Sequence, residues 1–216
     1  LNKYNTQYVI IYKHIYTKQS ETMTQMIFYD FETTGLNPFH EEIIEYSFNN
    51  DKTKHSMTGL VKPTKELNPI ITQITGITDK ILMNQLPLNN HIEPVFNYIT
   101  SCDDQVYLIA HNNDGFDRFF LRRMFKNNPH MNAVSKKWQY IDTLLLAKIV
   151  LPNNKSYSLK TLCSYFNLIE GTHRAEDDTR ALKNVYYKLV QMYCYKTKLN
   201  FDDIISNPSF IHDLIY

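Results

Sequence analysis

The sequence predicts an α/β domain with a central sheet and flanking helices, and three observations lead to this prediction. Short apolar segments with the composition of buried strands come first in the chain. Further along, such segments alternate with amphipathic helical patterns. The 216 residues, 43% of them hydrophobic, are enough to form one hydrophobic core. Strands first, and then strands alternating with helices, are typical of layered α/β folds.

Three strands are predicted near the start of the chain. Residues 26–31 are apolar and aromatic over a short stretch, as a buried strand is, and residues 33–35 break this pattern. Residues 41–48 and 55–61 are predicted to form two more strands in a meander with the first. Residues 63–90 contain prolines and a glycine, so we expect loops there with one or two short helices.

Helices dominate the rest of the chain. Apolar residues recur at helical spacing in these segments, which indicates amphipathic helices packed on a sheet. A buried strand over 106–110 and a short strand at 140–141 lie between them. We predict helices over 91–101, 116–125, 143–150, 158–165 and 175–194.

Most of the chain is predicted to be a single domain over residues 23–197. Residues 1–22 precede the first strong strand, and we expect them to be an extension that is either not native or poorly ordered. Residues 198–216 are predicted to be a C-terminal tail or a short docking helix, because the last of them are apolar.

Charge and cysteines limit the classes of protein. The net charge of +1 gives no sign of a polyanion partner, so any nucleic-acid contact must use local basic charge. We expect no transmembrane helix and no membrane partner, because no apolar run of 18 residues occurs. The three cysteines are far apart and form no disulfide or zinc pattern. They favour an intracellular, reducing compartment, either the cytoplasm or the nucleus or nucleoid.

Several common phosphate-binding and hydrolase motifs are missing. The sequence contains no GxxxxGK[ST] loop, GxGxxG turn, GxSxG elbow or HExxH pair. Their absence argues against most nucleotide hydrolases, dehydrogenases, serine hydrolases and zinc proteases.

Two acidic residues occur where apolar ones are expected. Asp30 and Glu32 lie two apart in the first predicted strand, so both carboxylates point to the same face. Adjacent carboxylates on a buried strand are unfavourable unless a cation compensates them. The alternative is a polar stripe that faces solvent.

Two more acids and a histidine extend this pattern. Asp117 lies near the start of a predicted helix, where an acid also suits the helix dipole. Asp178 shares the apolar face of the last long helix with Leu182 and Val185, and there it needs a partner or a metal. His173 precedes that helix in a predicted loop, where a lone histidine is more often structural or solvated.

Together these residues indicate metal-dependent chemistry on a phosphodiester. Four carboxylates without thiolates select hard cations, Mg²⁺ or Mn²⁺. Two such ions about 3.5–4 Å apart are the usual arrangement for in-line attack on a phosphodiester. An imidazole such as that of His173 can accept the proton of the attacking water near neutral pH.

Three motifs, in this order, resemble those of the DEDDh 3′–5′ exonucleases of the ribonuclease H-like superfamily. This group includes the bacterial DNA polymerase III epsilon proofreading subunit. The motifs are DFETTGL from Asp30 to Leu36, HNNDGFD from His111 to Asp117 and HRAEDD from His173 to Asp178. The similarity covers about residues 24–195. One departure is Thr75, which replaces the histidine of the family's His-Gly-Ile-Thr segment.

The resemblance implies a fold and a set of roles. The fold is ribonuclease H-like, with a mixed five-stranded central sheet flanked by helices. Asp30, Glu32, Asp117 and Asp178 would bind two Mg²⁺ or Mn²⁺ ions, and His173 would be the general base. Leu36 would wedge against the last base. Substrate-binding roles are implied for Thr33, Thr34, Gly35, Leu36, Asn112 and Phe116.

A basic segment offers candidate phosphate contacts. Residues 118–137 carry six Lys and Arg residues and no acid. Arg118 and Arg122 are four apart and therefore share a helix face. That face either contacts the phosphates of a strand or is simply solvated.

The predicted function is a metal-dependent 3′–5′ exonuclease that acts on single-stranded DNA or RNA ends and releases nucleoside 5′-monophosphates. One alternative is a nucleic-acid-binding module that keeps the fold without catalysis, and a weaker one is a ribonuclease H-like endonuclease. A polymerase or a second copy of the chain is a candidate partner. Proofreading, DNA repair and RNA trimming are all compatible with these motifs.

Overall fold

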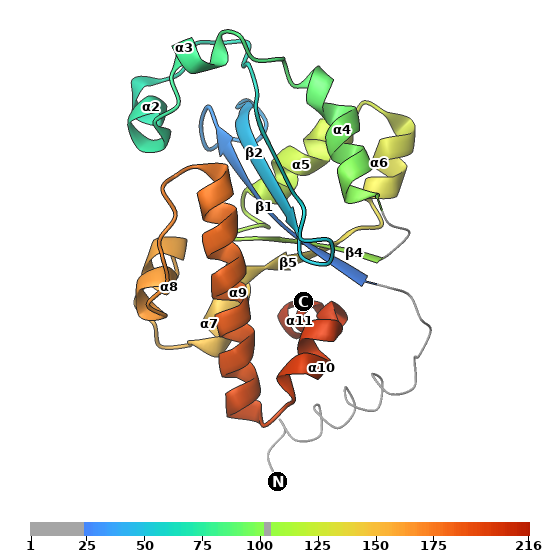
Figure 1. The fold of residues 1–216 in the computed structure, drawn as a ribbon, viewed down its shortest axis with the longest axis vertical. Helices are drawn as coiled ribbons and strands as arrows, with labels where there is room; N and C mark the ends of the chain where they lie inside the picture. The colour runs from blue at the N-terminus through green and yellow to red at the C-terminus, as the bar shows by residue number, and fades with distance from the viewer. Residues whose placement is uncertain (1–23, 102–104) are drawn as a thin grey trace.

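The computed structural model describes residues 24–101 and 105–216, so the predicted extension over 1–22 lies outside it. Five strands form one mixed sheet in the order β3-β2-β1-β4-β5 (Figure 1). Helices pack on both faces, and the predicted fold class is confirmed. The strands are β1 Thr24–Thr33, β2 Ile43–Asn50, β3 Ser56–Leu60, β4 Gln105–Ala110 and β5 Gln139–Asp142.

The centre of the sheet is β1, which has neighbours of opposite direction on its two sides. β2 pairs with it antiparallel and β3 continues the predicted meander, whereas β4 and β5 run parallel to β1. The β1–β4 register ends at Phe28, opposite Ile109, while the β1–β2 register continues to Thr33. The last residues of β1 therefore extend beyond β4, at the carboxyl ends of the parallel strands, where α/β sheets bind ligands.

The predicted helices are present, with additions between them. Asn128 caps and Pro129 begins a helix that the sequence analysis did not predict, because only Met131 and Val134 repeat at helical spacing there. The helices are α2 Pro69–Thr75, α3 Asp79–Leu82, α4 Asn89–Ile99, α5 Asp117–Phe125, α6 Pro129–Ser135, α7 Thr143–Val150, α8 Leu159–Tyr165, α9 Ala175–Thr197, α10 Phe201–Ser206 and α11 Pro208–Ile215.

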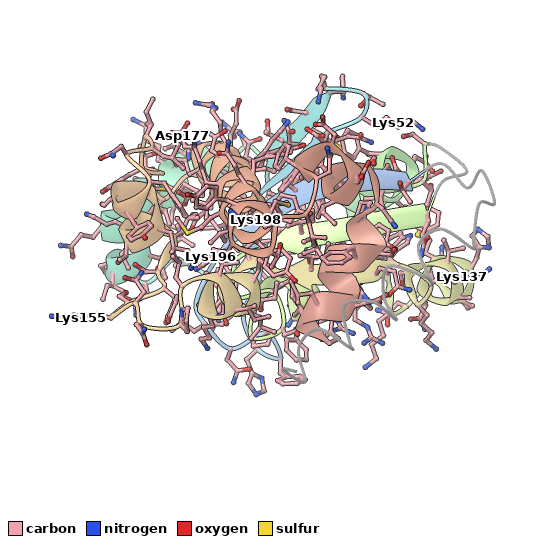
Figure 2. The ribbon with its side chains drawn as sticks, turned by 90° about the horizontal axis from the view of Figure 1, so that it is seen from below. Lys52, Lys137, Lys155, Asp177, Lys196 and Lys198 are labelled. Atoms are coloured by element: carbon pink, nitrogen blue, oxygen red, sulfur yellow. The ribbon has the colours of Figure 1, made fainter. Side chains whose placement is uncertain are left out.

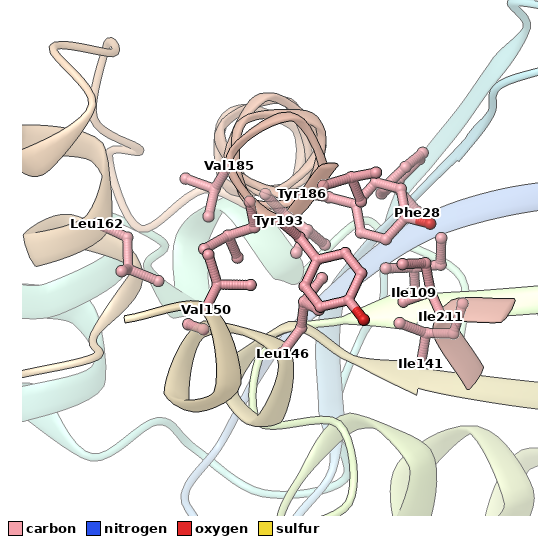
Figure 3. Close-up of a cluster of buried hydrophobic side chains, with 14 of the residues drawn as sticks. Phe28, Ile109, Ile141, Leu146, Val150, Leu162, Val185, Tyr186, Tyr193 and Ile211 are labelled. Carbon is pink, nitrogen blue, oxygen red and sulfur yellow. The ribbon is translucent and has the colours of Figure 1, made fainter. Parts of the chain in front are cut away.

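Alternate residues of β1 belong to two separate hydrophobic cores. Ile27 and Tyr29 pack toward α4 and α5 on one face of the sheet. Met26 and Phe28 pack on the other face, toward α7 and α9 (Figure 3). This two-residue period carries on to the end of the strand, so it decides which face receives the acidic side chains.

The C-terminal residues 198–216 form α10 and α11 and lie against the α9 side of the sheet (Figure 1). Phe210 and Ile211 are buried in the same core as Tyr193 of α9. Among the described residues, no helix is both long and apolar enough to cross a membrane.

Substitution of Leu182 by alanine tests how strongly α9 is held on the sheet. Leu182 is 1% exposed and packs in the core between α9 and β1, so we expect the free energy of unfolding to fall by about 2–5 kcal/mol. Ile169→Ala is the control, because this side chain is 89% exposed and should change stability by less than about 0.5 kcal/mol. Urea unfolding followed by circular dichroism measures both. Equal losses would contradict the packing described.

Candidate active site

Three carboxylates meet where the apolar side chains of β1 end. Asp30 and Glu32 follow Phe28 on the face of β1 that α9 covers, and Asp178 comes from the first turn of α9. Each residue contributes one carboxylate oxygen to a group in which all three lie within 4.8 Å of one another. We call Asp30, Glu32 and Asp178 the acidic cluster. Both β1 acids thus share one face, as the sequence predicts.

Asp117 lies beside this cluster and is bonded to the backbone of β1. It is the first residue of α5, it is only 2% exposed, and its Oδ1 accepts a hydrogen bond of 3.2 Å from the Phe31 N–H. Phe31 lies beyond the end of the β1–β4 register. The carboxylate of Asp117 thus satisfies a backbone donor of β1 in the region that β4 leaves open.

Burial raises the pKa of every acid in this group, and the charges of neighbouring group members raise the pKa of Asp30 and Glu32 further. Desolvation is the largest cause throughout, and it raises the pKa of Glu32 and of Asp117 to about 8 and that of Asp178 to about 6. The pKa of Asp30 is raised well above its ordinary value by desolvation and then by the charges of Asp117 and Glu32. A bound hard cation would remove this repulsion, and the oxygen donors fit Mg²⁺ or Mn²⁺.

A fifth carboxylate nearby already has a cationic partner. Glu45 of β2 lies opposite Glu32 in the register and is 6% exposed. Arg174 donates to it from Nε at 3.0 Å and from Nη2 at 2.6 Å, and the backbone N–H of Ala175 donates at 3.0 Å. Because Ala175 is the first residue of α9, this pair fixes the start of the helix that carries Asp178.

The loop before α9 encloses the carboxylate of Asp178. The backbone N–H of His173 donates to it, and a Cβ atom placed on Gly171 would lie 1.5 Å from its Oδ1. His173 itself has a φ of 57° and an exposed side chain, one residue before the anchored Arg174. The predicted base is therefore brought next to Asp178, with its imidazole at the rim of the site.

The loop after β1 has an ordered start and an exposed apolar tip. Thr33 and Thr34 are buried, and their hydroxyl groups donate within the loop, to the Gly35 carbonyl and to Glu41. Leu36 is 84% exposed. The two threonine side chains thus shape the loop, and Leu36 at its tip is left for outside contacts.

The second motif forms a tight turn between β4 and α5. Asn112 has a φ of 62°, is exposed, and donates its backbone N–H to Asp142 at 3.0 Å. Asn113 is fully buried and accepts a hydrogen bond from the hydroxyl of Tyr29 while donating to the carbonyls of two strands. Phe116 is half-buried at the start of α5. These hydrogen bonds hold the turn in place and thereby fix the position of Asp117 at the start of α5.

Only part of the predicted basic segment is available to a ligand. Arg118 is bonded to Asp114 at 2.9 Å and stacks over the ring of Tyr140. Arg123 donates to the backbone carbonyls of Pro38 and Glu41. Arg122 is exposed on α5, and Lys137 points outward from the edge of the domain (Figure 2).

Three residues of the site were missed by the sequence analysis. Glu45 could have been found, because like Asp30 it is an acid inside an apolar predicted strand. Arg174 follows His173 directly but shows no pattern of its own. The sequence does not indicate a role for Gly171, because that role depends on how close Asp178 lies in the folded chain.

A mixed sheet with acids at the end of its central strand is typical of the DEDD 3′–5′ exonucleases, which are phosphodiester hydrolases. The chain belongs to the exonuclease family RNase_T, whose model matches residues 27–186.

Curated relatives are much longer than this chain. It is 34% identical over 171 residues to a PolC-type DNA polymerase III of Mycoplasma genitalium, which covers 74% of this chain and 11% of the relative. It is 30% identical over 204 residues to the 3′-5′ exonuclease DinG of Staphylococcus saprophyticus, over 87% of this chain and 21% of the relative. The chain therefore spans only a small part of these proteins.

Solved structures share the fold. Exonuclease I of E. coli in complex with a dA16 oligonucleotide matches with a TM-score of 0.67 at 20% identity, over 85% of this chain and 43% of that one. Its complex with a dT13 oligonucleotide matches with a TM-score of 0.64 at 18% identity, over 77% and 40%. At this identity the likeness concerns the fold.

The pKa shifts predict that stability falls with rising pH when no divalent cation is bound. Glu32 and Asp117 have ordinary pKa values of 4.5 and 3.8 and titrate at about 8 in the folded chain. The folded state therefore binds these protons more tightly than the unfolded state. The stabilisation that they contribute is complete below about pH 4 and is lost as the pH rises through about 8. Thermal unfolding in EDTA should show a lower midpoint at pH 8.5 than at about pH 5, and Mn²⁺ should restore the midpoint.

Asp30→Asn gives a second test of the same repulsion. It should raise the unfolding temperature in EDTA at high pH and weaken the response to Mn²⁺. Asp202→Asn, at an exposed position in α10, is the matched control and should change neither. A stabilisation by Mn²⁺ that is equal in both variants would contradict the assignment.

Gly171→Ala should weaken metal binding while the chain stays folded. Its Cβ atom would collide with Oδ1 of Asp178, so the carboxylate must move. We expect the Mn²⁺ concentration needed for half-maximal thermal stabilisation to rise at least tenfold, equivalent to about 1.4 kcal/mol. Gly76→Ala is the control, since a Cβ atom there meets nothing within 4 Å and the substitution strains only the backbone. Unchanged Mn²⁺ dependence in Gly171→Ala would show that the carboxylate is not confined.

Proposed function

We propose that the chain is a metal-dependent 3′–5′ exonuclease that removes nucleoside 5′-monophosphates from single-stranded ends. The observation that carries the proposal is the acidic cluster with Asp117 beside it, four carboxylates with raised pKa values at the end of the central strand. Asp30, Glu32 and Asp178 would hold one Mg²⁺ or Mn²⁺ ion, and Asp117 would contribute to a second. When bound, the two ions would activate the attacking water and neutralise charge on the leaving oxygen.

His173 would act as the general base. Its imidazole is exposed at the rim of the site, next to Asp178, where it can accept the proton of a water molecule. The water oxygen then bonds to phosphorus while the bond from phosphorus to the 3′ oxygen breaks. That oxygen takes up a proton, which leaves a shortened strand and a nucleoside 5′-monophosphate.

The loop after β1 would bind the terminal nucleotide. Its backbone at Thr33, Thr34 and Gly35 would approach the sugar and phosphate, and the exposed Leu36 would lie against the last base. Asn112 and Phe116 would form the opposite wall. Of the two predicted phosphate contacts, Arg122 is the better candidate, because Arg118 is already paired with Asp114.

The relatives favour DNA as the substrate and a polymerase as a partner. One is named a DNA polymerase III, another a 3′-5′ exonuclease, and the E. coli structures hold DNA oligonucleotides. Cys163 and Cys194 are buried free thiols, which supports a reducing, intracellular location. The alternative function, a catalytically silent nucleic-acid-binding module, is disfavoured because the full acidic set and His173 are retained.

Cleavage of 5′-labelled single strands tests the proposal. With Mg²⁺ or Mn²⁺ we expect a ladder that shortens from the 3′ end, a preference for DNA over matched RNA, and no activity in EDTA. Asp117→Ala and His173→Ala should each lower kcat by at least about 100-fold. Asp202→Ala, an exposed acid in α10, should retain wild-type rates.

Three outcomes would contradict this function. The first is activity that survives EDTA, and the second is full activity of Asp117→Ala. The third is cleavage of a circular single strand, which would indicate an endonuclease. Tight strand binding without cleavage under either metal would favour the silent module.

A further inference from the structure

Two exposed aromatic rings lie together beside the proposed site. Phe39, in the loop after β1, is 76% exposed, and Phe119 of α5 is 44% exposed. Their ring centroids are 6.4 Å apart at an angle of 49°. Leu36, 84% exposed, belongs to the same loop as Phe39. Contiguous exposed apolar side chains are a feature of binding surfaces.

The loop that presents Phe39 is fixed. The side-chain oxygen of Asn37 accepts a hydrogen bond from the backbone N–H of Phe39. The backbone carbonyl of Asn37 accepts one from the N–H of Glu41. Arg123 of α5 reaches across and donates to the carbonyls of Pro38 and Glu41. These hydrogen bonds fix the loop with the Phe39 ring exposed to solvent. Because Arg123 belongs to α5, they also fix the position of this ring relative to Phe119.

Both segments that carry these rings also carry the proposed catalytic carboxylates. The Phe39 loop follows directly from β1, which holds Asp30 and Glu32, and α5 begins at Asp117, two residues before Phe119. Both rings are therefore joined to the proposed catalytic acids by short segments of chain.

The local charge favours a nucleic acid as the occupant. Arg122 is exposed on α5, the helix that carries Phe119, and Lys126 is exposed directly after the end of that helix. Both acids of the Phe39 loop already have partners: Glu41 accepts from Lys65 at 2.6 Å and from Thr34, and Glu42 accepts from Thr64 at 3.0 Å. Every base has a π-face that can stack on an aromatic ring, whatever the sequence.

We propose that Phe39 and Phe119 form a stacking platform for the bases that precede the 3′-terminal nucleotide. The proposal rests on the proposed exonuclease function and names how that site holds its substrate. Bases within a duplex are already stacked on each other, so the platform selects unpaired strands. Because stacking is tolerant of sequence, it sets a length requirement on the strand and little preference among bases.

Oligothymidylates of increasing length test the platform. For the wild-type chain KM should fall as the strand grows from a dinucleotide to a hexanucleotide. Phe39→Ala and Phe119→Ala should lose most of this fall, with KM for the hexanucleotide raised roughly fivefold or more. Phe39→Tyr should retain wild-type KM, whereas Phe39→Leu, apolar but not aromatic, should match Phe39→Ala. Tyr195→Ala is the control, because Tyr195 is 76% exposed but lies near the other end of α9 from Asp178.

The outcomes separate this inference from the function on which it rests. If the wild-type chain cleaves no strand, the proposed function fails, and the anisotropy of labelled hexathymidylate still measures the platform through its dissociation constant. If cleavage occurs and the two alanine variants keep the wild-type length dependence, the platform alone is overturned. The same holds if Phe39→Leu behaves as wild type. A change of oligomeric state in these variants with unchanged KM would overturn it in favour of a second copy of the chain.

Discussion

The ion pair between Glu45 and Arg174 determines where α9 begins. Glu45 lies on β2, beside the central strand, and its carboxylate binds both the side chain of Arg174 and the first backbone N–H of the helix. Charge-assisted bonds of this kind are stronger than neutral ones. They join two segments that are 129 residues apart and set the position of everything in the first turn of α9, including Asp178.

This pair also explains why the remaining acids stay uncompensated. Arg174 lowers the pKa of Glu32, but its Nε and Nη2 groups are already committed to Glu45. The other carboxylates therefore face one another in a poorly solvated space. Such an arrangement costs stability when the acids ionise, and a divalent cation would offset that cost.

The sequence was sufficient for the sheet and for the main acids, because both follow from short-range patterns. The two-residue period of β1 placed Asp30 and Glu32 on one face, and helical spacing placed Asp178 on the apolar side of α9. Gly171 and the Arg174–Glu45 pair could not be predicted, because they depend on contacts between distant segments. The bonds of Arg118 to Asp114 and of Arg123 to the Pro38 carbonyl could not be predicted for the same reason, since they exist only in the folded chain.

The internal use of Arg118 and Arg123 has a consequence for how long a strand would stay bound. Each phosphate that a protein neutralises releases condensed counterions, and this release makes binding tight at low salt and weak at high salt. A surface whose arginines are largely occupied elsewhere displaces few of them. Such an enzyme would tolerate salt, release its strand after few cleavages and act distributively, unless another polypeptide kept the 3′ end in place.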